Sequence, residues 1–205
     1  MLSPCCNWTT SEIGGEAVKI INDEISAAKS IESVTVPDSV TVILSGFNNW
    51  SALESIELSH NLKYIDYDVC VNTKIKSLTI PDGVIYLADS AFRGNSSLES
   101  VSAPAEMLWS FLKFSGAASN RSYIKTVNVT SGNEIYFDTF AGYSSLESAT
   151  IAASVDTIGD RAFKDLRSLT ELNYLGTTEQ WDKVRKGEDW DGGSYFVVSC
   201  SDSQA

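Results

Sequence analysis

The sequence has few of the residues on which enzymes and metal sites depend. Its 205 residues include one histidine, His60, and four cysteines without CxxC or Cys/His spacing. A Ser-His-Asp or Cys-His mechanism would rest on His60 alone, which follows Ser59 on a predicted turn, and a zinc site would lack its usual ligands. No GxGxxG motif or other phosphate-binding loop is present in the sequence. We therefore expect no catalytic residue, no metal ion and no cofactor, and we predict that the protein is not an enzyme.

Long apolar runs and positive charge are also scarce. No run approaches the roughly 18 to 20 apolar residues that a membrane-spanning helix needs, so we expect no membrane insertion. Residues 1–10 lack the charged and apolar regions of a signal peptide, which leaves a chain that stays inside the cell or a mature or trimmed form. With 15 Lys and Arg against 27 Asp and Glu, the net charge is −12. This balance argues against nucleic acid or an anionic membrane surface as a partner.

The sequence does contain an internal repeat. Each copy reads apolar-x-x-apolar-x-apolar, and successive copies start 22, 22, 23, 26, 22 and 23 residues apart. The seven copies start at Ile31, Leu53, Ile75, Leu98, Ile124, Leu146 and Leu169. Alternation of apolar and polar residues is typical of a short strand with one buried face, and one strand per repeat predicts a parallel sheet. The residues expected at the centres of the strands are Val34, Ile56, Leu78, Val101, Val127, Ala149 and Leu172.

The second half of each repeat is patterned as well. Prolines at 37, 81 and 104 are expected to end the strands, because proline lacks the donor that a sheet needs. Apolar residues follow, and then Ala-Phe at 91–92 and 162–163, with Phe47, Phe114 and Phe140 near the same position. These aromatic side chains are expected to fill the interior, as is Cys70. One turn cannot bury its apolar side alone, so stacking of turns must form the core.

Both ends of the repeat array are predicted to be capped. Residues 12–28 place apolar side chains at helical spacing and predict an N-terminal cap helix. Thr177 and Gln180 match a capping box that opens a short helix, and 195–198 predict a final strand. The predicted organisation is a cap over 1–29, repeats over 30–175 and a second cap over 176–205.

Three segments resemble the BspA-like leucine-rich-repeat surface proteins of bacteria. They are LTIPDGVIYLADSAFRGNSSLESV (78–101), LESATIAASVDTIGDRAFKDLRSLTEL (146–172) and the tail GTTEQWDKVRKGEDWDGGSYFVVSC (176–200). The resemblance covers 31–200, although the repeats at 98–123 and 124–145 lose the Ile-Gly-x-x-Ala-Phe stretch. It implies an α/β repeat solenoid, a right-handed leucine-rich-repeat superhelix with a parallel sheet on one face, an N-terminal helical cap and a C-terminal helix-plus-strand cap. It also implies a secreted or cell-surface adhesion module that binds host or matrix proteins.

The open face of the sheet is the first candidate binding site. Two outward columns flank the central strand residues, and nearly all of their members are small and polar. The first column is Ser33, Ser55, Ser77, Ser100, Thr126 and Ser148, and the second is Thr35, Glu57, Thr79, Ser102, Asn128 and Thr150. These columns are interpreted either as hydroxyl ladders on a crowded sheet or as a polar surface for an extended peptide or a glycan. The second candidate site is an aromatic patch of Trp50, Trp109 and Phe111, which lie either inside an enlarged turn or on an exposed apolar bump.

Three functions remain open. The leading hypothesis is an extracellular or cell-surface, adhesin-like module that binds a host or matrix protein or a glycan. The first alternative is a structural spacer of a larger surface protein. The second alternative is a carboxylate-dependent hydrolase with its cleft beside the fourth repeat. Exposure of Trp50, Trp109 and Phe111 favours binding, their burial favours the spacer, and a deep pocket with two facing acids favours the hydrolase.

Overall fold

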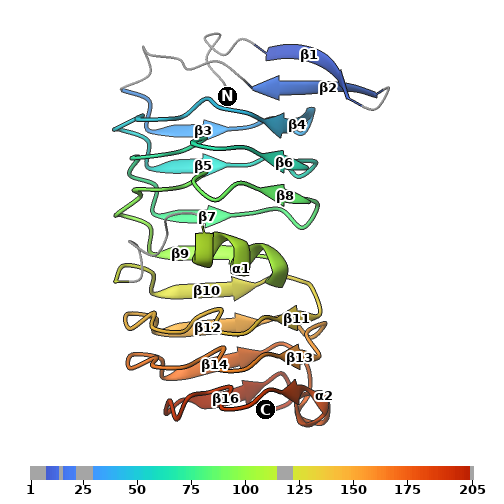
Figure 1. The fold of residues 1–205 in the computed structure, drawn as a ribbon, viewed down its shortest axis with the longest axis vertical. Coiled ribbons are helices and arrows are strands. Elements are labelled where there is room, and N and C mark those ends of the chain that lie inside the picture. Colours follow the sequence, from blue (N-terminus) through green and yellow to red (C-terminus); the bar gives the residue numbers. More distant parts are fainter. Residues whose placement is uncertain (1–7, 14–15, 22–29, 115–121, 204–205) are drawn as a thin grey trace. The chain divides into compact units, whose positions relative to one another are not determined.

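The computed structural model describes residues 8–13, 16–21, 30–114 and 122–203. The chain forms two compact units, the first made of Met1–Leu98 with Phe114–Asn120 and the second of Glu99–Lys113 with Arg121–Ala205. In both units the chain winds through repeated turns, and most turns place one strand on each of two walls (Figure 1).

In the first unit, the short strands of the first three repeats form one wall of the solenoid, which we call the front wall. Strands β3 (Ser33–Thr35), β5 (Ser55–Glu57) and β7 (Ser77–Thr79) lie side by side. β3 and β5 are parallel, and their register pairs residues that are 22 apart in the chain. The second wall, which we call the rear wall, is formed by β4 (Val40–Ile43), β6 (Tyr64–Ile65) and β8 (Tyr86–Leu87), which are also parallel. One repeat is therefore one turn of the solenoid.

The second unit continues the same plan with longer front strands. β9 (Ser100–Ala103), β10 (Thr126–Val129), β12 (Ser148–Ile151), β14 (Glu171–Tyr174) and β16 (Val197–Cys200) form a parallel sheet in that order. The rear wall holds β11 (Glu134–Ile135), β13 (Thr157–Ile158) and β15 (Arg185–Lys186). The seven strands predicted from the repeat are present, and the central residue of each is buried. The last strand starts at Val197, two residues later than predicted.

The core between the walls follows the predicted columns. Ala91-Phe92 and Ala162-Phe163 are fully buried, and Phe47 and Phe140 are buried at the matching position. The side chain of Phe114 lies outside the described residues. After the strands, the carbonyls of Pro37 and Pro81 accept hydrogen bonds from the N–H groups three residues later, at 2.9 and 3.1 Å. The prolines thus end the front strands and open the turns towards the rear wall.

The N-terminal cap is not a helix where it is described, so that prediction is wrong. Residues 8–13 and 16–21 form strands β1 (Trp8–Ile13) and β2 (Glu16–Ile21), which pair antiparallel. β2 in turn pairs in parallel with β4. The apolar spacing also fits strands, and two features of the sequence favour them: the β-branched residues and the pair Gly14-Gly15, which is typical of hairpin turns. In addition, pairing with β2 covers an edge of β4 that would otherwise be unpaired. Residues 22–28 of the predicted helix lie outside the described residues.

A helix replaces the rear-wall strand in the fourth repeat. Helix α1 (Ala105–Phe114) follows Pro104, whose carbonyl accepts a hydrogen bond from the Leu108 N–H. Leu108, Phe111 and Leu112 lie on one face of the helix and are buried. In this longer repeat, the described residues after the front strand therefore form a helix with a buried apolar face.

The second helix is the short one predicted near the C-terminus. Helix α2 (Thr178–Lys183) begins with the expected capping box. The Thr177 hydroxyl accepts a hydrogen bond from the Gln180 N–H, and the Gln180 side chain accepts one from the Thr177 N–H. Trp181 packs against Tyr174 of β14, with 5.2 Å between the ring centroids. The helix is thereby fixed against the last predicted repeat.

Asn95 is the main polar group inside the first unit. Its Oδ1 accepts hydrogen bonds from the Thr73 N–H at 2.9 Å and from the Thr73 hydroxyl at 2.7 Å. Its Nδ2 donates to the carbonyls of Cys70 and Phe92, both at 2.8 Å. Asn95 and Thr73 are both buried. One amide group therefore satisfies the polar atoms of two consecutive turns.

We predict that Phe163→Ala destabilises the protein by about 3 to 5 kcal/mol, because it would leave a cavity between well-packed rings. Phe163 is fully buried, and its ring lies 5.0 Å from that of Phe140 and 5.9 Å from that of Trp190. Urea unfolding of both proteins measures the difference. Tyr195→Ala, at an exposed position, is the control and should change stability by less than about 0.5 kcal/mol. A loss below about 1 kcal/mol for Phe163→Ala would contradict its placement in the core.

Asn95→Ala should also destabilise the protein, by about 2 to 4 kcal/mol, because two carbonyls and the Thr73 groups would lose their partner inside the core. The matched control is Asn61→Ala, which removes one exposed hydrogen bond to the Asp38 carbonyl and should cost less than about 1 kcal/mol. Chemical denaturation of the three proteins gives both values. Equal losses for the two variants would show that the buried network contributes little.

Candidate binding face

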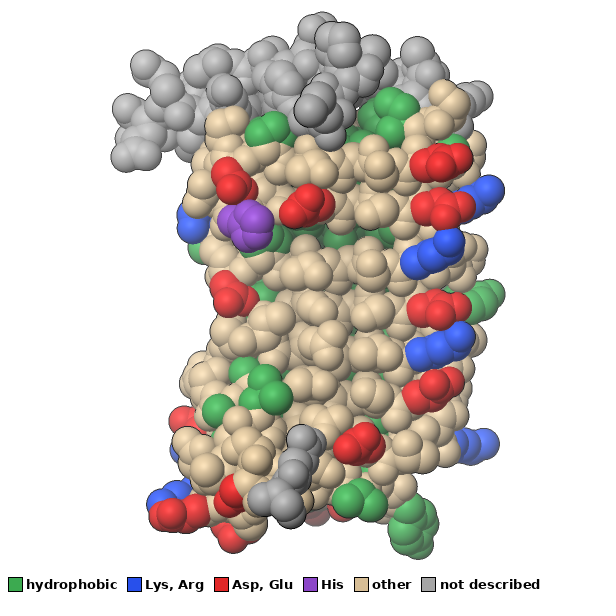
Figure 2. Space-filling model, turned by 180° about the vertical axis from the view of Figure 1, so that it is seen from behind, with side chains coloured by type: hydrophobic (Ala, Val, Ile, Leu, Met, Phe, Trp, Pro, Cys, Tyr) green, Lys and Arg blue, Asp and Glu red, His purple; other side chains and the backbone are tan. Residues whose placement is uncertain are grey.

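The predicted open face is present in both units. In the first unit Ser33, Ser55 and Ser77 and their neighbours Thr35, Glu57 and Thr79 are all exposed. In the second unit the corresponding side chains are half-buried: Ser100, Ser102, Thr126, Asn128, Ser148 and Thr150. The parallel register places counterparts side by side on β3 and β5 in the first unit and on β9, β10 and β12 in the second. Figure 2 shows the result as a face on which charged and hydrophobic side chains are sparse.

The polar groups of this face make few hydrogen bonds to one another. The Thr35 hydroxyl donates to Glu57 at 3.2 Å, and the Asn128 amide donates to the Ser102 hydroxyl at 2.9 Å. Among the described residues, no side-chain hydrogen bond joins Ser33, Ser55 and Ser77 into a ladder. The hydroxyls of these strands therefore face solvent, where a ligand can accept from them or donate to them.

In each unit, charged side chains border the open face where its strands begin (Figure 2). In the first unit Lys76 contacts Glu54 at 2.6 Å, and in the second Lys125 contacts Glu99 at 3.2 Å. The hydrogen bond from Lys76 lowers the pKa of Glu54. All four side chains are well exposed, so these pairs add little stability. Their effect is to give this border of the face both signs of charge.

The second candidate site, the aromatic patch, does not form. Trp50 is only 2% exposed and packs edge-on against Phe47, with ring centroids 5.2 Å apart. Phe111 is fully buried on the inner side of α1. Trp109 is half-buried beside Tyr136 and Phe137 of the turn after β11. Large aromatic rings contribute most when they are buried in the core, and two of the three residues are used in this way.

Other aromatic residues are exposed, and the sequence reasoning missed them. Tyr64 of β6 and Tyr86 of β8 are 42% and 39% exposed on the rear wall of the first unit. Their ring centroids are 5.9 Å apart. The hydrogen bond from the Tyr86 hydroxyl to the Tyr67 hydroxyl, aided by burial and by Asp66 and Asp89, raises the pKa of Tyr86 to about 12. Tyr64 and Tyr86 are 22 residues apart, which is one repeat, and this spacing was the signal in the sequence that could have revealed the pair.

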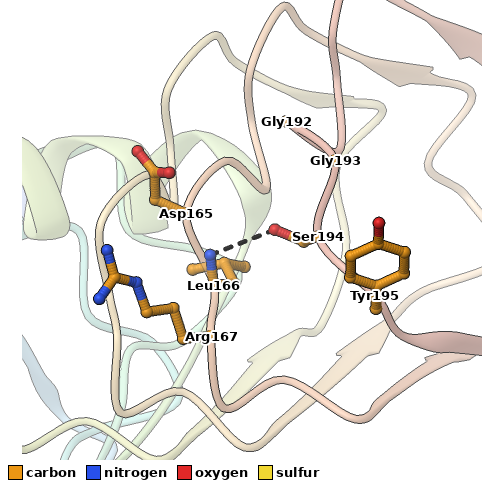
Figure 3. A pocket seen from close by; sticks show the side chains of 7 residues that line it. All are labelled: Asp165, Leu166, Arg167, Gly192, Gly193, Ser194 and Tyr195. Carbon is orange, nitrogen blue, oxygen red and sulfur yellow. Dashed lines mark hydrogen bonds between the residues drawn. The ribbon is translucent and has the colours of Figure 1, made fainter.

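A pocket of about 320 Å³ lies between two turns of the second unit (Figure 3). Asp165, Leu166 and Arg167 form one side, and the stretch from Gly192 to Tyr195 forms the other. The Ser194 hydroxyl accepts a hydrogen bond from the Leu166 N–H at 3.2 Å and donates one to the Phe163 carbonyl. Ser194 therefore ties the two turns together, and its hydroxyl is already used for structure.

The one histidine lies on an exposed turn, as predicted. The side chain of His60 is 77% exposed, and its Nδ1 lies 3.0 Å from Asp38, which also accepts a hydrogen bond from the His60 N–H. The bond from that N–H, followed by the ring contact, lowers the pKa of Asp38. Asp38, Glu57 and His60 line a pocket of about 230 Å³ in the first unit. A carboxylate-dependent hydrolase of the glycosidase type uses a carboxyl group with a raised pKa as its general acid, whereas the pKa of Asp38 is lowered.

Within the described ranges, no group of three or more His, Cys, Asp or Glu side chains is placed to hold a metal ion. None of the helices in the described part of the chain combines the length and apolar character that crossing a membrane requires.

A short parallel strand in each turn, repeated at 22 to 26 residues with apolar columns facing inward, defines a leucine-rich-repeat solenoid. The model of the BspA-type leucine-rich repeat region matches residues 19–135 and 114–183 in six copies. The chain belongs to this family, and the resemblance seen in the sequence is confirmed.

Among solved structures, the chain is similar to two bacterial leucine-rich-repeat proteins. A leucine-rich cell surface protein of Faecalibacterium prausnitzii is 17% identical with a TM-score of 0.35, and the match covers 76% of this chain and 62% of that one. A leucine-rich-repeat protein of Bacteroides ovatus is 16% identical with a TM-score of 0.39, and 98% of this chain and 71% of that one are covered. The chain thus spans less than two thirds of the F. prausnitzii protein. No curated protein matches the chain.

The buried thiol of Cys70 makes the free energy of unfolding depend on pH. Its thiol is fully buried near the Thr73 hydroxyl, as the repeat position predicts, and burial raises its pKa from 9.0 to about 12. The unfolded chain therefore loses this proton at lower pH than the folded protein does. The contribution of this thiol to stability is thus fully present below about pH 9 and falls by about 1.4 kcal/mol per pH unit between there and its folded pKa of about 12.

We predict that the free energy of unfolding, measured in urea between about pH 9 and pH 11, falls more steeply for the wild type than for Cys70→Ala, by this amount per unit. The variant lacks both the packing of the sulfur and the titrating thiol, so its stability at neutral pH differs and only the slopes are compared. Parallel pH profiles would contradict the burial of this thiol.

Proposed function

We propose that the chain is a protein-binding module of an extracellular or cell-surface bacterial protein, and that the open face of the sheet is its binding surface. The supporting observation is the set of exposed polar columns on β3, β5 and β7, in which no side-chain hydrogen bond joins Ser33, Ser55 and Ser77 to one another and one bond, from Thr35 to Glu57, links neighbouring strands among the described residues. These side chains are exposed to water. A ligand that donates and accepts hydrogen bonds can therefore replace that water at little cost, because no hydrogen bond in the core has to break.

The chemistry of the face favours many weak contacts. Protein interfaces usually depend on aromatic and arginine anchors, and the columns of the open face contain neither. A flat surface of hydroxyl and amide groups suits an extended peptide segment of a host or matrix protein. Affinity would then come from contact area or from several copies displayed together on a longer surface protein. The net charge of −12 makes nucleic acid an unsuitable partner.

A location at the cell surface is part of this proposal. Membership of the BspA-like family, which includes bacterial surface proteins, supports it. A glycan is a second ligand that the same hydroxyl columns can accept, because sugars and peptide groups use the same donors and acceptors.

A non-binding spacer is the second candidate function. The burial of Trp50 and Phe111 supports it, because the expected aromatic anchors are used in the core. A stack of turns in which each repeat contacts its neighbours is also suited to setting distance. The two functions differ in whether substitutions on the open face change any binding.

The experiment is solid-phase binding of the purified protein to immobilised extracellular-matrix proteins and glycans. We expect saturable binding that Ser55→Arg with Ser77→Arg weakens at least about tenfold, because two long side chains would block the centre of the face. The matched control carries Ser96→Arg and Ser144→Arg, which add the same charge at exposed turn positions. Circular dichroism checks that both variants are folded.

The outcomes separate the two functions. Loss of binding in the first variant only would support the open face as the binding surface. Equal binding by both variants would move the binding site elsewhere, and the proposed use of this face would be wrong. No binding by folded wild-type protein to any member of the panel would favour the spacer.

A further inference from the structure

The rear wall of the first unit carries an incomplete ladder of rings. The parallel register places Val42, Tyr64 and Tyr86 at equivalent positions on β4, β6 and β8. The rings of Tyr64 and Tyr86 lie on neighbouring turns with centroids 5.9 Å apart, and their planes are tilted by 32° to one another. At the third position the ladder has the smaller side chain of Val42. The row of rings thus stops at Tyr64.

A slot is present at this end of the ladder. Its volume is about 320 Å³, and Val42, Leu44, Tyr64, Asp66 and Tyr86 line it. Leu44 is 39% exposed and supplies apolar surface, whereas Asp66 supplies the one carboxylate of the lining. None of the described residues that line the slot is basic. The slot therefore combines the flat sides of aromatic rings with a negative charge.

The carboxylate is held in place. The Oδ1 atom of Asp66 accepts a hydrogen bond from the Tyr67 N–H at 2.8 Å. Among the described residues Asp66 has no ion pair. Tyr86 is fixed in turn by the 3.5 Å hydrogen bond from its hydroxyl to that of Tyr67. Asp89 lies near enough to add to the negative potential at Tyr86, on a chain with a net charge of −12.

We propose that this slot binds the side chain of an arginine on a protein partner, with its guanidinium group stacked on Tyr64 and paired with Asp66. The guanidinium group is planar, stacks on aromatic rings and is always charged, so it can take the next place in the ladder of rings. It also offers two parallel N–H donors to a carboxylate. A lysine ammonium group is more strongly hydrated and not planar, and so fits the same site less well.

This inference goes beyond the proposed function. The slot lies on the rear wall, whereas the hydroxyl columns lie on the front wall, so neither site depends on the other. A partner could be held by the front wall, by the slot or by both. The charge complementarity between an acidic slot and a basic side chain also supplies the kind of anchor that the open face lacks.

The test is an NMR titration of the whole protein with blocked Gly-Gly-Arg-Gly-Gly peptide, followed through the amide signals of Tyr64, Asp66 and Tyr86. The matched peptide contains citrulline, which has the same shape as arginine and no charge. We expect saturable shifts with arginine, weaker binding at higher salt, and binding that is about two- to fivefold weaker with citrulline, as for an exposed cation–π contact.

Two variants and one control locate the site. Tyr64→Leu removes the ring but keeps an apolar side chain, and Asp66→Asn removes the charge but keeps the oxygen that accepts from Tyr67. Each should weaken arginine binding about two- to fivefold, while the control Tyr123→Leu, at an exposed tyrosine in the second unit, should not.

Several results would overturn the proposal. Equal binding of the arginine and citrulline peptides would show that charge plays no part. Saturable shifts of the same signals with methyl glucoside, and none with arginine, would make the slot a saccharide site. Self-association of the wild type that Tyr64→Leu abolishes would instead make it a contact between copies of this chain.

Discussion

The structure depends on one constraint, the parallel register that places each residue beside its equivalent one repeat later. A turn of 22 residues forms too few contacts of its own to bury its apolar side chains, so each turn is stable only when a neighbour covers it. The register turns a sequence pattern into columns, with Val34, Ile56 and Leu78 in the core and Ser33, Ser55 and Ser77 in solvent. The front face, the aromatic ladder and the buried network of Asn95 all follow from this alignment.

Much of this could be predicted from the sequence, because the register makes the repeat period directly visible. The front strands and the inward aromatic residues at 92 and 163 were correct for this reason. The prediction failed at 12–13 and 16–21, where the same apolar spacing fits a helix and a pair of strands. Strands are favoured over a helix there because β2 pairs with the edge of β4. That edge exists only in the folded protein and cannot be seen in the sequence of the segment.

The candidate sites were harder to predict than the fold. Trp50 and Phe111 looked suitable for an exposed patch, but whether an aromatic ring in a turn faces inward depends on the path of the turn. Tyr64 and Tyr86 were overlooked because each is a single tyrosine on a two-residue strand. In the structure the two tyrosines line one slot together with Val42 and Asp66, and this slot could not be predicted from the sequence.

The burial of Asn95 has a consequence for how the protein can be made. Asn95-Ser96-Ser97 is an acceptor sequence for N-linked glycosylation, and both hydrogens of the Asn95 amide already donate to carbonyls inside the first unit. A glycan attached there would occupy the core. In a eukaryotic secretory pathway, the glycosylating enzyme and the folding of this turn would therefore compete for the same side chain, whereas bacterial expression avoids that competition.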